Sequence, residues 1–261
     1  MRSLSRDAKR ARPALGTLVE IRLADASSAA PAFESAFQAV ERVHRLMSRQ
    51  ERDSDVARIN RAAPGELVTV DAWTWDVLRR AKELHGATDG LFDCAVAPAS
   101  RGSLADLQLL PGNGVVLSRP LAITLDGIAK GYAVDRAVDA LRAAGATAGV
   151  VNAGGDLRLF GDEMQPIHVR HPGSPGKFIS IGCAKEAGIA SSGRYFSNSL
   201  LVDPRTMRPH GSAWSATVIA PDCATADALT KPCLLDRARA KRLASACGAR
   251  AILLSPQHRL H

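Results

Sequence analysis

Lys130 lies in a segment whose composition suits anion binding. Residues 126–131 read DGIAKG, and two glycines flank the lysine where a strand pattern gives way to a helix pattern. A helix start presents unpaired N–H groups and the positive end of the helix dipole, which favour phosphate, and the lysine adds a point charge. The segment has neither the Walker A nor the GxGxxG spacing. By itself it is equally typical of a glycine-rich helix start with a solvated lysine.

Residues 152–156, NAGGD, interrupt an apolar stretch of the chain. Gly154 and Gly155 permit positive φ and a close approach of the backbone. Asn152 and Asp156 can hydrogen-bond to a turn. Two interpretations stay open: a plain hairpin turn, or a wall at which a flat or charged ligand meets bare backbone.

A third segment, ATADALT at residues 224–230, places Asp227 and Thr230 on one face of a helical turn. A carboxylate and a hydroxyl at this spacing can bind a hard cation such as Mg²⁺ through oxygen. The alternative is a capping or turn role for both side chains.

The elements that must position these segments follow from hydrophobic periodicity. Alternation predicts a strand over residues 17–23, and apolar stripes predict helices over 31–49 and 72–88. The helix that follows Gly127 should end at Gly145. A helical turn over CATADALTK should be interrupted at Pro232. Further expectations are a cap at Ser54, two short strands within 114–125, strands on both sides of NAGGD, strands in PIHVRHP, FISIG, GIASS and 213–222, a helix in DRARAKRLASACG, and a last strand in ARAILLS.

The mixed order of strands and helices predicts an α+β fold, with antiparallel-rich mixed sheets and helices on their outer faces. The chain shows no internal repeat and no low-complexity linker. We therefore expect a single domain over residues 15–261, preceded by a basic N-terminal arm at 1–14.

Charge and cysteine content exclude several classes of protein. The net charge is +8, but the basic residues are spread along the chain, and aromatic residues make up only 4%, so base-stacking platforms are scarce. We expect no nucleic-acid partner; an anionic small ligand or an acidic partner fits the charge. Five cysteines without CxxC spacing argue against a disulfide framework and a zinc site.

The chain has no apolar run long enough to predict a membrane span. Its N-terminus is basic but lacks the apolar core of a secretory signal. The sequence as it stands predicts a cytoplasmic protein, and a periplasmic location fits if the chain is a mature or truncated form.

Six segments follow one another along the chain: ALGTLVEIRL, MSRQERDSDVARIN, GLFDCAVAP, LDGIAKGYAVDRAVDALRAAGATAGVVNAGGDLRLFG, DPRTMRP and SATVIAPDCATADALT. In this order they resemble the ApbE family, the FAD:protein FMN transferases. The similarity runs from Leu15 to the last strand and is strongest between Gly127 and Asp156.

The resemblance implies an ApbE-like flavin transferase fold and a Mg²⁺-dependent reaction. Such an enzyme cleaves the pyrophosphate of FAD, attaches FMN through a phosphoester to a Thr or Ser of an acceptor protein, and releases AMP. The alternatives are a pyrophosphatase that converts FAD to FMN and AMP, and a catalytically weak or silent FAD-binding protein.

The resemblance also assigns roles to individual residues. It places FAD contacts at Leu15, Leu91, Phe92, Asp93, Thr124 and Lys130, with Lys130 at the phosphates. It places the metal at the backbone carbonyl of Gly127, at Asp227 and at Thr230. Asp227 is also the predicted catalytic residue, which orients or deprotonates the attacking hydroxyl.

Four positions depart from the family pattern. Thr124 and Arg194 replace aspartates of the family, and Leu200 replaces a histidine. Lys231 stands where the family has a threonine. Its ammonium would repel Mg²⁺ at short range, or it would replace the ion by pairing with phosphate itself.

Overall fold

A seven-stranded sheet organises the protein in the computed structural model, which describes residues 8–24, 29–97, 100–193 and 201–257. Its strands lie in the order β1 (Ala8–Ala14), β2 (Thr17–Leu23), β6 (Gly149–Ala153), β7 (Asp156–Phe160), β10 (Gly188–Ser192), β13 (Ser215–Ala220) and β14 (Arg250–Leu254). Every strand pairing among the described residues is antiparallel. The predicted α+β fold is confirmed, with sheets more uniformly antiparallel than expected.

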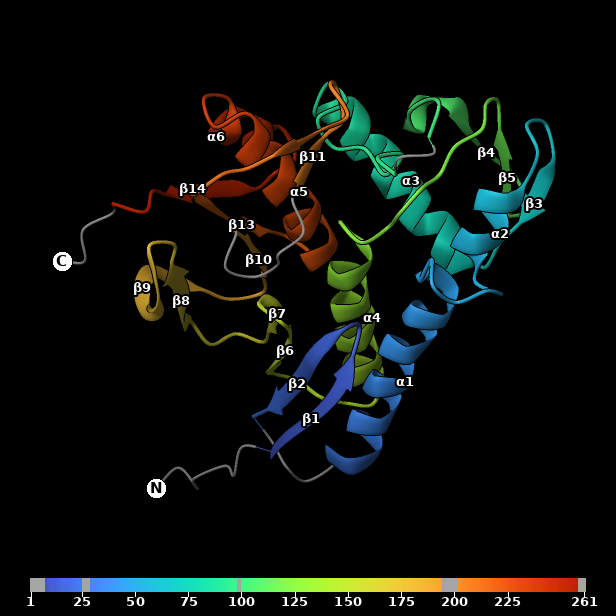
Figure 1. Ribbon diagram of the computed structural model, residues 1–261. Helices are drawn as coiled ribbons and strands as arrows, with labels where there is room; N and C mark the ends of the chain where they lie inside the picture. Colours follow the sequence, from blue (N-terminus) through green and yellow to red (C-terminus); the bar gives the residue numbers. More distant parts are fainter. Residues whose placement is uncertain (1–7, 25–28, 98–99, 194–200, 258–261) are drawn as a thin grey trace, which may run out of the picture.

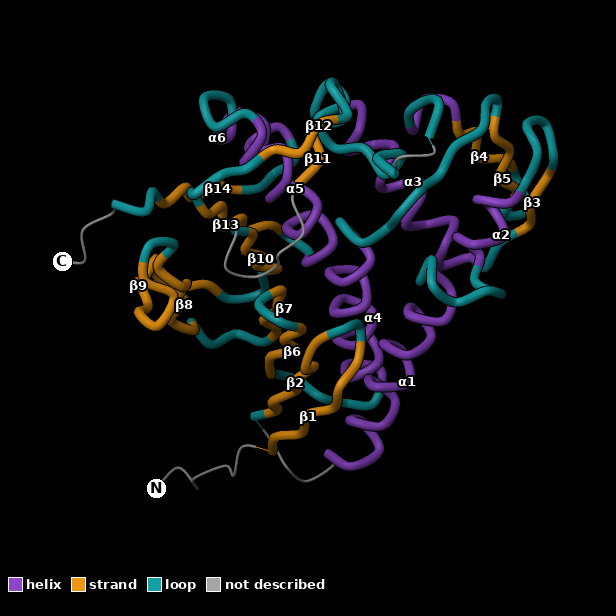
Figure 2. Tube along the Cα trace, in the orientation of Figure 1, coloured by secondary structure: helices purple, strands orange, loops and turns teal. Residues whose placement is uncertain are grey.

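Helices α1 (Ala29–Met47) and α4 (Ala129–Ala143) cover one face of this sheet (Figures 1 and 2). The alternation in 17–23 explains why: Val19, Ile21 and Leu23 are buried on the helix side. They pack with Phe37 of α1 and with apolar residues of α4. Gly145 follows the last residues of α4 with φ +91°, as its predicted place at the helix end requires.

The opposite face carries the hairpin of β8 (Gln165–His171) and β9 (Ser174–Ala184) (Figure 1). Leu159 of β7, Ile167 of β8 and Ile189 of β10 form a small separate cluster there. The hairpin thus supplies the cover on this face, and the site described below lies away from it.

A second region packs α3 (Ala72–Ala87) against a three-stranded sheet in the order β3-β5-β4. Its other elements are α2 (Asp55–Arg61), β3 (Leu67–Thr69), η1 (Leu104–Asp106), β4 (Leu107–Leu110) and β5 (Gly114–Leu117). Ser54 caps α2 as predicted, accepting a hydrogen bond from the Ala57 N–H at 3.0 Å. This region shares one core with α5 (Cys223–Leu235), so residues near position 92 come to lie beside α5.

Only the first of the two strands predicted within 114–125 forms, as β5. Beyond it, Ile123 is buried but pairs with no neighbouring strand. The side chain of Asn60 takes the place of a partner strand, since its amide binds both the N–H and the carbonyl of Ile123 at 2.8 and 2.9 Å. Side-chain hydrogen bonds of this kind leave no periodic signal in the sequence.

Two other predictions are wrong. Residues 8–14 of the predicted arm form β1, an edge strand that pairs with β2 along its whole length. Backbone pairing needs no apolar side chains, and basic residues are common on exposed edge strands. Residues 1–7 of the predicted arm lie outside the described part of the chain.

The second wrong prediction concerns Pro232, which does not interrupt α5; the helix continues to Leu235. A proline removes one backbone hydrogen bond, and the buried packing of α5 compensates for it.

The chain ends with α6 (Ala240–Ala246) and β14, after a short two-stranded sheet of β11 (Leu201–Asp203) and β12 (Arg208–His210). Within the residues that the structure describes, no helix combines the length and the apolar character needed to cross a bilayer.

Candidate functional site

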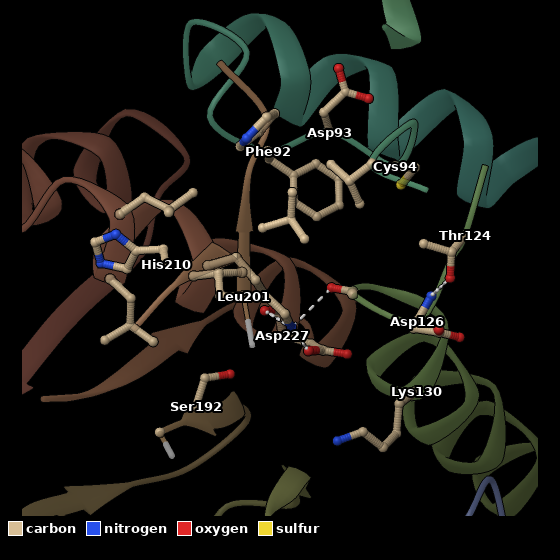
Figure 3. A pocket seen from close by; sticks show the side chains of 18 of the residues that line it. Phe92, Asp93, Cys94, Thr124, Asp126, Lys130, Ser192, Leu201, His210 and Asp227 are labelled. Atoms are coloured by element: carbon tan, nitrogen blue, oxygen red, sulfur yellow. Dashed lines mark hydrogen bonds and ion pairs between the residues drawn. The ribbon is translucent and has the colours of Figure 1, made fainter. Parts of the chain in front are cut away.

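A cavity of about 590 Å³ opens where α4 begins, opposite α5 (Figure 3). Its size lies in the range of small-molecule sites. The predicted site residues come together here, with one exception, Thr230. Those that line the cavity are Leu15, Leu91, Phe92, Asp93, Thr124, Gly127, Lys130 and Asp227.

Gly131 allows α4 and α5 to meet closely beside Asp227, which lines the cavity. A Cβ at this position would lie 2.3 Å from the backbone oxygen of Cys223, so only glycine fits. The Gly131 N–H donates to Oδ2 of Asp227 at 3.2 Å. An unpaired donor in the first turn of α4 is thus satisfied by a carboxylate of α5, and Asp227 is held in place with 2% of its surface exposed.

Lys231 places its ammonium group between three oxygens. Nζ lies 2.8 Å from the backbone oxygen of Asp227 and 3.2 Å from that of Gly127, and it forms an ion pair with Oδ1 of Asp227. An ammonium has three protons to donate, and these oxygens are in reach of all three. Because Gly127 lies two residues before the first residue of α4, Lys231 ties the start of that helix to α5.

Lys130 forms an ion pair with Asp156, whose side chain is only 3% exposed. The pKa of Asp156 is raised to about 6, because burial and the nearby Asp227 carboxylate oppose its ionisation more than Lys130 and Lys231 favour it. The pKa of Lys130 is also raised: burial opposes its charge, but Asp156 and Asp227 outweigh burial. Lys130 therefore enters the cavity as a cation.

Two hairpin turns form one wall of the cavity. The turn between β1 and β2 holds Leu15 at φ +53° and Gly16 at φ +70°, and the turn between β6 and β7 holds Gly154 at φ +63°. A Cβ on Gly154 would lie 2.5 Å from Oγ1 of Thr17, so the second turn packs directly on the first hairpin. NAGGD is thus both a hairpin turn and a piece of bare backbone at the cavity, and Asp156 at its end pairs with Lys130.

The wall contributed by residues 91–93 is apolar. Leu91 and Phe92 line the cavity and are almost fully buried. Asp93 lines it too, but its carboxylate is turned away from Asp227 (Figure 3) and accepts from the N–H groups of Ala95 at 2.7 Å and Leu104 at 3.2 Å. Burial raises the pKa of Asp93 in spite of these hydrogen bonds and the neighbouring His85. The carboxylate of Asp93 thus helps to hold the loop that follows it.

The family model of the ApbE family matches residues 15–253 of the chain. The chain belongs to the ApbE family. The FAD:protein FMN transferase of Vibrio cholerae is 29% identical over 232 residues, which cover 73% of this chain and 69% of that protein. The FAD:protein FMN transferase of Rhodobacter capsulatus is 30% identical over 229 residues, which cover 73% of this chain but only 44% of that longer protein.

Solved structures of ApbE proteins share the fold. The flavin transferase ApbE from Vibrio cholerae superposes with a TM-score of 0.82 and 25% identity, covering 95% of this chain and 94% of that one. The ApbE protein from Thermotoga maritima gives a TM-score of 0.82 and 26% identity over the same shares of the two chains.

One predicted residue of this ApbE-family site, Thr230, is placed differently from expectation. Thr230 does not line the cavity; its hydroxyl lies 2.7 Å from the backbone oxygen of Asp227 and 2.8 Å from the hydroxyl of Ser192. Thr124 lines the cavity, and its hydroxyl accepts from the Asp126 N–H at 3.3 Å. The predicted metal ligands Gly127 and Asp227 do converge, but on the ammonium of Lys231.

Sequence reasoning missed Ser192 and His210, which also line the cavity. Nε2 of His210 is buried and has no hydrogen-bond partner among the described residues. Ser192 ends β10, and His210 ends β12 directly after the DPRTMRP segment; neither belongs to a spacing that by itself indicates chemistry, and only the fold brings them to one cavity. Two of the positions that depart from the ApbE pattern, Arg194 and Leu200, lie outside the described residues.

Proposed function

We propose that this chain is an FAD:protein FMN transferase, which moves FMN from FAD to a Thr or Ser hydroxyl of an acceptor protein and releases AMP. The observation that carries the proposal is that a helix start and two lysines face an apolar wall within one cavity. That combination suits a dinucleotide, which has a doubly charged centre and flat aromatic ends. The names of the relatives of known activity agree with it.

In this proposal the charged part of the cavity binds the pyrophosphate. Lys130 and Lys231 supply positive charge, and the start of α4 supplies the positive end of its dipole. Leu91 and Phe92 offer the apolar surface for a ring of FAD. The two hairpin turns, with Leu15 and Gly154, let a ligand approach bare backbone.

The reaction is a displacement at phosphorus. The oxygen of the acceptor hydroxyl forms a bond to the FMN-side phosphorus, and the bond from that phosphorus to the bridging oxygen breaks. AMP leaves with the bridging oxygen and its electron pair. Such reactions depend on positioning and on stabilising the charge of the phosphoryl oxygens, and the two ammonium groups provide that stabilisation.

The hydroxyl proton needs an acceptor, for which Asp227 is poorly suited. Oδ1 of Asp227 is paired with Lys231, and Oδ2 accepts from Gly131. We assign Asp227 the role of a positioning residue, which holds Lys231 and the start of α4 in register. His210 has a ring nitrogen without a partner among the described residues and lines the same cavity, so we assign proton uptake to its Nε2.

The Mg²⁺ dependence implied by the family resemblance needs a cation site, and the residues present do not fit one. Mg²⁺ requires oxygen ligands at about 2.0–2.1 Å in octahedral geometry. The oxygens of Gly127 and Asp227 are already in contact with the ammonium of Lys231, and the Thr230 hydroxyl is turned to Ser192. Nor do the described residues include any cluster of three His, Cys, Asp or Glu side chains. The reaction above therefore contains no metal-dependent step.

A second candidate function is FAD binding without turnover. The engagement of both Asp227 oxygens favours it, because the group predicted to activate the acceptor hydroxyl is not free. It predicts a yellow complex with FAD and no AMP.

One experiment separates these functions. The purified protein is incubated with FAD, with and without the acceptor domain of a characterised FAD:protein FMN transferase, and nucleotides are separated by chromatography. A transferase yields AMP together with covalent flavin on the acceptor, and His210→Asn lowers the rate while FAD still binds. FMN and AMP without an acceptor would indicate a pyrophosphatase. FAD binding without AMP in either mixture would leave the silent binder.

A further inference from the structure

The ammonium group of Lys231 occupies the position at which the predicted metal ligands meet. Its three acceptors are the backbone oxygens of Gly127 and Asp227 and the carboxylate of Asp227. Gly127 belongs to the segment before α4 and lies 104 residues before Lys231 in the sequence. Asp227 belongs to α5 and lies four residues before Lys231. Lys231 thus makes the same link between the two segments that a shared cation would make.

The side chain of Lys231 is held rather than mobile. The side chain is 21% exposed and starts one helical turn after Asp227. Its aliphatic part passes close to Gly127, since a Cβ added to that glycine would lie 3.6 Å from Cε of Lys231. A divalent ion could reach the same oxygens only by displacing this ammonium, and two cations a few ångströms apart repel each other strongly outside bulk water. The ammonium of Lys231 therefore occupies the position that a divalent cation would need.

We propose that Lys231 permanently replaces a divalent metal in this protein, so that FAD binds next to the lysine's charge and requires no Mg²⁺. The inference rests on the proposed function, because it takes the pyrophosphate of FAD as the group that faces Lys231. An ammonium carries one charge where Mg²⁺ carries two, and Lys130 on the neighbouring helix supplies a second fixed charge at the cavity. Each ammonium is paired with a buried carboxylate, Lys231 with Asp227 and Lys130 with Asp156, so the pyrophosphate meets two ion pairs whose cations the chain itself provides.

Binding measurements test this without relying on turnover. FAD affinity is measured by quenching of flavin fluorescence, once in EDTA and once in excess Mg²⁺, and Mn²⁺ binding is measured separately by electron paramagnetic resonance. For the unaltered protein we expect the same affinity for FAD in both solutions and no bound Mn²⁺. An FAD affinity that needs Mg²⁺, or stoichiometric binding of Mn²⁺, would overturn the proposal.

The variant Lys231→Thr sharpens the test, because it removes the ammonium and adds a hydroxyl beside the same oxygens. We expect it to lose about tenfold to a hundredfold in FAD affinity in EDTA, as is typical when a group that orients a site is removed, to bind Mn²⁺, and to regain FAD affinity with Mg²⁺. Lys241→Thr, a change at an exposed lysine of α6, is the matched control and should alter none of these values. Circular dichroism verifies that both variants fold. If Lys231→Thr does not fold, Lys231→Met is used instead to measure the loss of FAD affinity in EDTA. A folded Lys231 variant that binds FAD in EDTA as tightly as the unaltered protein also contradicts the proposal.

Failure of this inference and failure of the proposed function can be told apart. Equal FAD binding with and without Mg²⁺, but no AMP, would reject the transferase and leave the role of Lys231 standing. No FAD binding in either solution would reject both the transferase and the placement of FAD beside Lys231. AMP release that stops in EDTA while FAD still binds would retain the transferase and reject metal independence.

Discussion

Two buried aspartates tie α4 and α5 together, and they do so reciprocally. Asp135 of α4 accepts from the N–H groups of Cys223 and Ala224 at the start of α5, at 2.9 Å each. Asp227 of α5 accepts from the N–H of Gly131 near the start of α4. Each helix thus provides a carboxylate for unpaired donors in the first turn of the other.

The two aspartates differ in the cationic side chain with which each forms an ion pair. Asp135 is paired with Arg158 of β7 at 2.8 Å and does not line the cavity, whereas Asp227 is paired with Lys231 at the cavity wall. The ion pair of Asp135 is therefore structural, whereas the ion pair of Asp227 is accessible to a ligand in the cavity. Access to the cavity, rather than the type of residue, separates the two roles.

Removal of the structural pair should have the largest effect. Asp135→Ala leaves Arg158 without its buried partner and two N–H groups of α5 unsatisfied. Loss of one partner of a buried pair costs roughly 3–5 kcal/mol, which we expect to see as a lower free energy of unfolding in a urea titration. Asp139→Ala, at a half-exposed carboxylate of the same helix, should change it by less than about 0.5 kcal/mol. Similar losses in both variants would show that the buried pair has no special role.

Removal of the charge at the cavity should affect activity more than stability. Asp227→Asn keeps the shape of the side chain but weakens its hold on Lys231, and a positioning residue of this kind contributes about tenfold to a hundredfold to activity. The expected result is that fall in the rate of AMP release, with a smaller loss of unfolding free energy than Asp135→Ala. A variant that unfolds as readily as Asp135→Ala, or that releases AMP at the original rate, would contradict the contrast between the two aspartates.

The last expected effect is a change in the pH dependence of stability, due to Asp156. Its pKa of about 6 in the folded protein is above the ordinary value of 3.8, so the folded state holds the proton more tightly than the unfolded state between these values. The stability that this proton provides is present below about pH 4 and is lost as the pH rises through about 6. Relative to Asp156→Asn, the unaltered protein should lose unfolding free energy between about pH 4 and pH 7. Parallel curves for the two proteins, recorded by urea unfolding, would show that the pKa is not raised.

Periodicity was sufficient to predict most of the fold. The strand at 17–23 and the helices around 31–49 and 72–88 have one buried and one exposed face, which gives a clear signal. The signal failed where side chains do not determine the structure: the exposed, basic edge strand β1 is held by backbone pairing, and the segment at Ile123 is held by one asparagine.

Motifs predicted where the site lies but not how its charges pair. The glycine-rich start of α4 and the Asp227 segment are local patterns, and both line the cavity. The contact between Lys231 and Gly127 joins positions 104 residues apart, and the orientation of Thr230 toward Ser192 depends on the packing of α5 on β10. Such long-range contacts cannot be read from spacing along the chain.

The tight fit of Gly131 against Cys223 limits how this family member can diverge. With no room for even a methyl group between the two helices, the distance from the Gly127 carbonyl to α5 is fixed by the backbone and cannot be adjusted by small changes in packing. The cation between these two segments then depends on the side chain at position 231, whose ammonium contacts both of them. In our proposal, a lysine at this position supplies from the chain itself the cation that would otherwise be taken up from solution.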